Sequence, residues 1–240
     1  MPDYENVQLT IDLRTGVGTG HAWLNGDGLV TSLALMDAYG PRYFGLVAEL
    51  EHRDGPPKTA AELGVDVPLA ETDGVRHASI TFFDTDGETA AETPRFTTNL
   101  YGRYDASYAH LVGGSRPRTK IPIGGGHYKS ILNGLVYQPA DTCTLFFRGD
   151  RERLERLFER NFAALWKKRG VGFGAVNDWR WDTLGADLSV VRGGRAMRPL
   201  PTEKLTAWSD SATLSWRAPY HARENHTECA PPGAEVEPAW

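Results

Sequence analysis

Three adjacent cations stand immediately before a glycine-rich stretch at residues 167–181, and this combination suggests contact with a phosphate backbone. The cations are Lys167, Lys168 and Arg169, and glycines follow at positions 170, 172 and 174. Glycines at alternate positions form poor helices and poor strands, but they allow a backbone to lie against a bulky ligand. The candidate contacts are Lys167, Lys168, Arg169, Gly170, Gly172, Phe173 and Gly174. Alternatively, the cations offset the partial negative charge at the end of a preceding helix.

Cations and tyrosines also alternate along residues 84–123, a segment without helical or strand periodicity. Tyrosines stack on bases and cations pair with phosphates, which is how single-stranded nucleic acid is usually held. A loop of this length in a compact domain is usually functional or disordered. The alternative is a solvated loop whose tyrosines fold back on the core. The candidate RNA contacts in this segment are Arg103, Tyr104, Tyr108, Arg116, Arg118 and Lys120.

A second glycine-rich turn, Gly-Gly-Gly-His-Tyr-Lys-Ser at 124–130, adds four candidate contacts. It differs from a P-loop, because Tyr128 stands where that motif requires a glycine before its lysine. The side chains are of the types that could cleave RNA, since imidazole titrates near neutral pH and lysine stabilises developing negative charge. Consecutive residues of an extended chain point apart, however, which disfavours a convergent catalytic site. We therefore interpret His127, Tyr128, Lys129 and Ser130 as RNA contacts.

Two further patterns do not meet the requirements of known sites. Glycines at 16, 18 and 20 lack the third glycine of a dinucleotide fingerprint, because position 21 is His. His221, His226 and Cys229 could ligate a metal, but no fourth ligand is evident and their spacing fits no zinc signature. We expect no metal site, no cofactor and no catalytic residue.

The charge of the chain is unevenly distributed, although the net value is −5. Residues 1–94 carry 5 Lys+Arg against 16 Asp+Glu, or −11, whereas residues 95–182 carry 15 against 8, or +7. Attraction to a polyanion depends on the local field, because salt screens distant acids within about 8 Å. The basic middle of the chain is therefore the candidate binding surface.

Composition suggests a folded cytoplasmic protein, with 40% apolar residues available for a core. No apolar run of about 18 residues could cross a bilayer, and the first residues lack a signal-peptide pattern. Two cysteines do not make a disulfide framework, which agrees with a reducing compartment.

Residue patterning predicts the order of the elements. Alternation of apolar and polar residues predicts strands at 7–13 and 173–181 and a central strand at 75–83. Further strands are expected at 43–50, 131–137 and 142–147. Turn-forming and acidic residues predict a surface insertion at 51–74. One helix covers 29–39 and stops at Gly40-Pro41.

A second helix begins after Asp150, which is placed as its N-cap. Apolar residues at spacings of three and four give this helix one buried face, formed by Leu154, Leu157, Phe158, Phe162 and Leu165. The complete order predicts an α+β fold with a ferredoxin-like βαββαβ core and long insertions. Beyond it, segments 188–191, 197–201 and 214–216 are expected to add irregular or edge-strand material.

A ferredoxin-like (RRM-like) core with a basic glycine loop between its last helix and last strand resembles the RAMP superfamily of CRISPR proteins, and three patterns in order narrow the resemblance. They are Gly-His-Tyr-Lys-Ser at 126–130, Lys-Lys-Arg-Gly-Val-Gly-Phe-Gly-Ala-Val at 167–176, and Arg-Pro-Leu-Pro at 198–201. More narrowly, they resemble the type IV subunit related to the fifth Cas family. The resemblance covers the C-terminal two-thirds of the chain; the acidic insertion at 51–74 and the residues after 219 have no counterpart.

The resemblance implies a non-catalytic subunit of a type IV CRISPR effector ribonucleoprotein. Such a subunit binds the 5′ handle of the guide RNA (crRNA), contacts the backbone-forming RAMP subunit and the large subunit, and meets target DNA indirectly, with no membrane partner. It implies one RAMP-like RNA-binding domain over 1–218, with part of 84–123 projecting as a thumb. The tail or arm expected at 219–240 is predicted by the four prolines of the last residues, Pro219, Pro231, Pro232 and Pro238. The competing hypothesis is a metal-independent endoribonuclease that processes precursor guide RNA, as some relatives in the fifth Cas family do.

Overall fold

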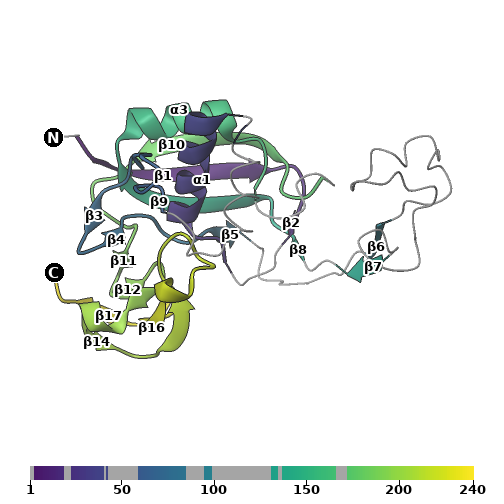
Figure 1. Ribbon diagram of the computed structural model, residues 1–240. Helices are drawn as coiled ribbons and strands as arrows, with labels where there is room; N and C mark the ends of the chain where they lie inside the picture. The colour runs from purple at the N-terminus through teal and green to yellow at the C-terminus, as the bar shows by residue number, and fades with distance from the viewer. Residues whose placement is uncertain are drawn as a thin grey trace, which may run out of the picture.

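A four-stranded antiparallel sheet in the order β10-β1-β9-β5 forms the centre of the structure (Figure 1). The computed structural model describes residues 3–18, 23–40, 42, 59–84, 95–98, 131–134, 137–165 and 172–240. The four strands are β1 (Glu5–Leu13), β5 (Phe82–Asp84), β9 (Thr142–Gly149) and β10 (Val176–Thr183). The expected strands at 7–13, 142–147 and 173–181 correspond to β1, β9 and β10.

Two helices pack on one face of this sheet, α1 (Gly26–Tyr39) and α3 (Arg151–Asn161). Strand pairing puts alternate apolar residues of neighbouring strands side by side: Leu9 lies between Leu145 and Trp181. This register follows from the two-residue period of a strand, which keeps one set of side chains on the covered face. The core therefore lies between the sheet and the two helices.

The N-terminus of α3 has the cap expected from the sequence, because Asp150 accepts a hydrogen bond from the backbone N–H of Arg153 at 3.0 Å. All five apolar residues predicted for its buried face are in the core, but Phe162 is the C-cap of α3 and Leu165 lies beyond its end, so the helix is shorter than expected. Phe158 meets Trp181 edge to face at 5.2 Å between ring centroids, and Phe162 meets Trp179 at 5.8 Å. These aromatic pairs fix α3 against β10.

Short strand pairs flank the main sheet. β2 (Val17–Gly18) pairs with β8 (Tyr137–Gln138), and β3 (Glu71–Thr72) pairs with β4 (Val75–Arg76). β6 (Arg95–Thr98) pairs with β7 (Ile131–Gly134). The strand expected at 43–50 lies outside the described residues.

The C-terminal residues form a second hydrophobic cluster, shown in green and yellow at the bottom of Figure 1. Two of its sheets are strand pairs: β11 (Val191–Arg192) with β12 (Arg195–Ala196), and β14 (Leu205–Trp208) with β17 (Val236–Pro238). A third sheet has three strands in the order β13 (Leu200–Pro201), β16 (His226–Ala230) and β15 (Ala212–Ser215). The 3-10 turns η4 (Thr202–Lys204) and η5 (Arg223–Asn225) connect them.

Residues 219–240, expected as a tail or arm, contribute strands to this cluster instead. β16 lies between β13 and β15, and Cys229 and Ala230 have no exposed surface. The prolines that suggested a tail stand at turns and strand ends. The cluster is bound to the main core by a backbone hydrogen bond from Ile80 to Met197 at 2.8 Å.

Two expectations for the middle of the N-terminal half are wrong. Residues 75–83 were expected as a central strand, but they divide between β4 and β5, and β5 is an edge strand. The buried polar side chains in this run, including His77, bond to distant residues; His77 Nδ1 lies 2.5 Å from Asp187 Oδ2. Residues 59–74 are also more than a surface insertion, because Val67 and Leu69 belong to the core.

The described chain is a mixed α+β structure with antiparallel sheets, in agreement with the expected class. No helix in the described part of the chain is long and apolar enough to cross a membrane.

Candidate nucleic-acid interface

The glycine loop that precedes β10 is held against the turn that follows β1. Thr15 Oγ1 donates to the Gly172 carbonyl at 2.7 Å and accepts from the Ala175 N–H at 3.0 Å. The Gly174 N–H donates to the Gly16 carbonyl at 2.9 Å. One threonine thus bridges both sides of the loop, a role that no local sequence signal reveals, because Thr15 and Gly172 are 157 positions apart.

Gly174 is required by the fold. Its φ is +63°, and a Cβ there would lie 2.0 Å from the carbonyl oxygen of Leu165. The same pair is joined by a hydrogen bond from the Leu165 N–H to the Gly174 carbonyl at 2.7 Å. The close approach that this glycine permits is therefore to the protein's own backbone.

Gly172 differs from Gly174, because its φ is +95° and no atom of the described residues lies within 4 Å of a Cβ built there. This exposed position is where a ligand backbone could approach.

We expect Gly174→Ala to lower the free energy of unfolding by about 2–3 kcal/mol, because it adds a backbone clash to the left-handed penalty. Gly172→Ala should cost about 1 kcal/mol, from the backbone conformation alone. Urea unfolding of both variants measures the difference. Equal losses would show that the contact between Gly174 and Leu165 does not constrain the loop.

Aromatic and cationic side chains surround the loop. Phe173 and Tyr137 are half-buried, and their ring centroids are 5.8 Å apart. Gly16 leaves room for Tyr137, because a Cβ there would lie 2.6 Å from its ring. Arg14, which was outside the predicted set, is exposed and donates its backbone N–H to the Ala175 carbonyl at 2.8 Å. We call Arg14, Thr15, Tyr137, Gly172 and Phe173 the glycine-loop surface.

The structure brings together three of the predicted site residues, Gly172, Phe173 and Gly174. The others lie outside the described residues: Arg103, Tyr104, Tyr108, Arg116, Arg118, Lys120, His127, Tyr128, Lys129, Ser130, Lys167, Lys168, Arg169 and Gly170. Helix α3 ends at Asn161, and the alternative interpretation of the three cations as helix caps falls on residues outside the described part of the chain.

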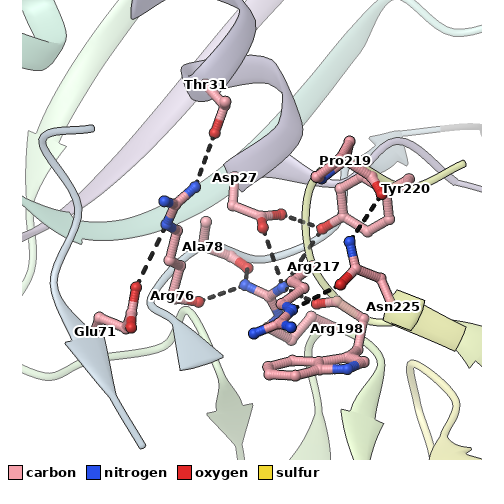
Figure 2. Close-up of polar contacts among 11 residues, drawn as sticks. Asp27, Thr31, Glu71, Arg76, Ala78, Arg198, Arg217, Pro219, Tyr220 and Asn225 are labelled. Atoms are coloured by element: carbon pink, nitrogen blue, oxygen red, sulfur yellow. Dashed lines mark hydrogen bonds and ion pairs between the residues drawn. The ribbon is translucent and has the colours of Figure 1, made fainter. Parts of the chain in front are cut away.

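Arg198, from the Arg-Pro-Leu-Pro pattern, is buried, and its guanidinium bonds to backbone carbonyls, to Asp27 and to the Tyr220 hydroxyl (Figure 2). Its Nη1 donates to the carbonyls of Arg76 and Ala78. Its Nη2 donates to the Trp216 carbonyl at 2.5 Å and lies 3.3 Å from Asp27 Oδ2. Arg198 therefore joins the start of α1, the hairpin β3–β4 and the second cluster.

Tyr220 completes this network by donating its hydroxyl to Asp27 Oδ1. Burial and the neighbouring Asp27 carboxylate raise the pKa of Tyr220 well above its ordinary value, so the hydroxyl remains a donor. Burial opposes the charge of Arg198, but the interaction with Asp27 outweighs it and raises the pKa of the guanidinium. Tyr220 and Arg198 are thus each fixed in one protonation state at neutral pH.

The sequence Asn-Gly-Asp-Gly at 25–28 is explained by this packing. A Cβ at Gly26 would lie 2.6 Å from the Ser79 carbonyl, and one at Gly28 would lie 3.0 Å from the Tyr220 ring. Asp27, between them, has no exposed surface. By itself, the sequence of this run predicts a turn before a helix. Its structural role follows only from its contacts with Ser79 and Tyr220, which are distant in the sequence.

The sequence matches no protein-family model and no curated protein. The site must therefore be interpreted from its own chemistry. The glycine-loop surface offers aromatic rings for stacking, a cation for a phosphate and an open backbone position, which together suit single-stranded nucleic acid.

Proposed function

We propose that this chain is a non-catalytic RNA-binding subunit of a type IV CRISPR effector ribonucleoprotein. In this role it holds the 5′ handle of the guide RNA and caps the filament of backbone subunits. The observation that carries the proposal is the glycine-loop surface, where Gly172, Phe173 and Tyr137 lie beside Arg14 at one end of the sheet. The cationic stretch at 167–169 directly precedes this surface in the chain.

The proposal includes a ferredoxin-like core, and the connections between strands support it. Helix α1 links β1 to β5, with β9 between them in the sheet, and α3 links β9 to β10, with β1 between them. Two interleaved β-α-β units of this kind make the split βαβ arrangement of ferredoxin-like folds. The glycine loop then falls between the second helix and the last strand, as the resemblance implies.

The buried state of Arg198 also agrees with the proposal. The resemblance includes its Arg-Pro-Leu-Pro pattern, and the network of Arg198, Asp27 and Tyr220 gives the arginine a structural role in place of an RNA contact. RNA binding is then left to the exposed loop.

The test is RNA retention by the chain expressed with a CRISPR array and the other subunits. We expect purified protein to carry RNA of uniform 5′ end, and to leave precursor RNA intact for hours in the presence of a chelator. Protein free of RNA at low salt would contradict the proposal. Cleavage at a single position, abolished by His127→Ala, would replace it with the endoribonuclease hypothesis.

A further inference from the structure

An open hollow of about 560 Å³ lies on the second hydrophobic cluster, where the strand pair β14–β17 meets the turn that joins β11 to β12. Figure 1 shows β14 and β17 on the side of the cluster that faces away from the main sheet. The hollow shares no residue with the glycine-loop surface. We call it the Trp208 hollow, and the lining side chains that can bind a ligand are Arg195, Trp208, Ser209, Glu235 and Glu237.

Trp208 gives the hollow an exposed aromatic face. It is 44% exposed and is one of three large hydrophobic residues that are exposed in the described part of the chain. Trp216, in the same cluster, is buried, and two cations lie over its ring, Arg217 at 4.8 Å and Lys204 at 5.8 Å from the centroid. No cation of the described residues lies over Trp208. Because the face of an indole attracts cations, Trp208 is available to a cation from another molecule.

One carboxylate of the hollow carries an uncompensated charge. The Arg195 guanidinium is already engaged, since it donates to the Gly233 carbonyl at 2.9 Å and lies 3.2 Å from Glu235 Oε1. Glu237 is exposed, and its side chain has no hydrogen bond or ion pair with the described residues. The lining of the hollow therefore has a net charge of one negative unit, located at Glu237.

The surroundings of the hollow are also acidic, because residues 200–240 carry six Asp or Glu against three Lys or Arg. Two of these cations bond within the protein. Lys204 Nζ lies 2.9 Å from Asp73 Oδ2, and Arg217 Nε donates to Asn225 Oδ1 at 2.8 Å. A negative local field attracts cations and repels the phosphates of a nucleic acid. The hollow therefore suits a cationic segment of a protein better than it suits RNA.

Arginine fits an aromatic face beside a carboxylate better than lysine does. Its planar guanidinium stacks on an aromatic ring and at the same time presents a fork of N–H donors to a carboxylate. The ammonium group of lysine is a compact, strongly hydrated charge that does not stack. Tryptophan and arginine are also enriched among the residues that dominate the binding energy of protein interfaces.

We propose that the Trp208 hollow docks an arginine side chain of a partner protein, stacked on Trp208 and paired with Glu237. The inference goes beyond the proposed function, because it assigns a protein contact to a surface that includes neither the glycine loop nor the cations at 167–169. Glu237 belongs to residues 219–240, which have no counterpart in the CRISPR resemblance, so the resemblance does not account for this surface.

A peptide with a single arginine, acetyl-Gly-Ser-Arg-Ser-Gly-amide, is the probe. It is titrated into the isotope-labelled full chain, and binding is followed from the backbone amide and tryptophan indole NMR signals. Two matched peptides carry lysine or citrulline in place of arginine, and citrulline keeps the planar group without its charge. We expect saturable shifts of the Trp208 indole signal, with arginine binding about threefold more tightly than lysine and about tenfold more tightly than citrulline.

Two pairs of variants locate the site. Trp208→Leu should weaken binding of the arginine peptide by about tenfold. Trp240→Leu is its control, because Trp240 is also 44% exposed but does not line the hollow. Glu237→Gln should weaken binding by about fivefold, whereas Glu224→Gln removes the same charge from η5, outside the hollow. Equal losses within either pair, or equal binding of the arginine and citrulline peptides, would overturn the site.

The same variants separate this inference from the proposed function. RNA retention by Trp208→Leu at the wild-type level, together with loss of the arginine peptide, would support both proposals. Loss of RNA from Trp208→Leu at an unchanged melting temperature would make RNA the occupant of the hollow and overturn the protein contact. Binding of the arginine peptide by a chain that retains no RNA would support the hollow and contradict the RNA-binding role.

Discussion

Replacement of Arg198 by methionine should lower the free energy of unfolding by about 3–5 kcal/mol, the usual cost of removing one partner from a buried ion pair. The Asp27 carboxylate would remain buried without its cation, since the two side chains are each 1% exposed. The Arg76 and Trp216 carbonyls would also lose their donors. Urea unfolding followed by tryptophan fluorescence measures the loss.

Arg217→Met provides the control, because Arg217 lies 4.8 Å above the ring of the same Trp216 but is exposed. It should cost about 1–2 kcal/mol, because it removes the cation–π contact and also the hydrogen bond that Arg217 Nε donates to Asn225 Oδ1 at 2.8 Å. The double variant Asp27→Asn with Arg198→Met should lose less than the sum of the two single variants, since it leaves no buried charge unpaired. A loss for Arg198→Met no larger than that for Arg217→Met would show that the network does not bind the cluster to the core.

Elements whose signals are local could be predicted from the sequence. β1 follows from strict alternation, and α3 follows from a cap at Asp150 and an apolar stripe that begins at Leu154, although the predicted stripe continues past the end of the helix to Leu165. Each signal is contained within one element and its immediate neighbours, so no knowledge of distant partners is needed.

Elements that depend on distant partners were mispredicted or missed. Residues 75–83 alternate like a central strand, but His77 and its neighbours are buried by bonds to residues such as Asp187, 110 positions away. The C-terminal segment has prolines and little periodicity, yet β16 is the middle strand of a sheet. In both segments, contacts with residues distant in the sequence determine which side chains are buried. Local composition does not predict these contacts.

In the candidate site, too, the features that depend on contacts distant in the sequence could not be predicted. Glycines at 172 and 174 are predicted together as ligand-facing, but the structure separates them: Gly174 accommodates the Leu165 backbone, while a Cβ at Gly172 would meet no atom of the described residues. Arg14 could not be selected from the sequence, because it stands in an acidic half of the chain and reaches the loop only through its pairing with Ala175.

The largest expected effect on binding comes from replacing Lys167, Lys168 and Arg169 together by alanine. Each phosphate contact on a single strand contributes about 0.7 to the slope of log affinity against log salt. Loss of three contacts should therefore make the slope shallower by about 2 and weaken binding at low salt by about tenfold or more. Filter binding of a single-stranded RNA over a range of salt concentrations measures both quantities. Arg14→Ala should reduce the slope by about 0.7 alone.

A matched control removes the same charge from another part of the molecule. Arg153, Arg156 and Arg160 lie on α3, and each is within 4.0 Å of an acid, namely Asp66, Glu152 and Asp37. Exposed ion pairs of this kind contribute about 0–1 kcal/mol to stability, so their replacement by alanine should leave the protein folded. If only net charge governed binding, both triple variants would shift the slope equally. We expect the α3 variant to keep the wild-type slope, because its arginines already pair with carboxylates, and an equal shift in both would remove the glycine loop from its proposed role.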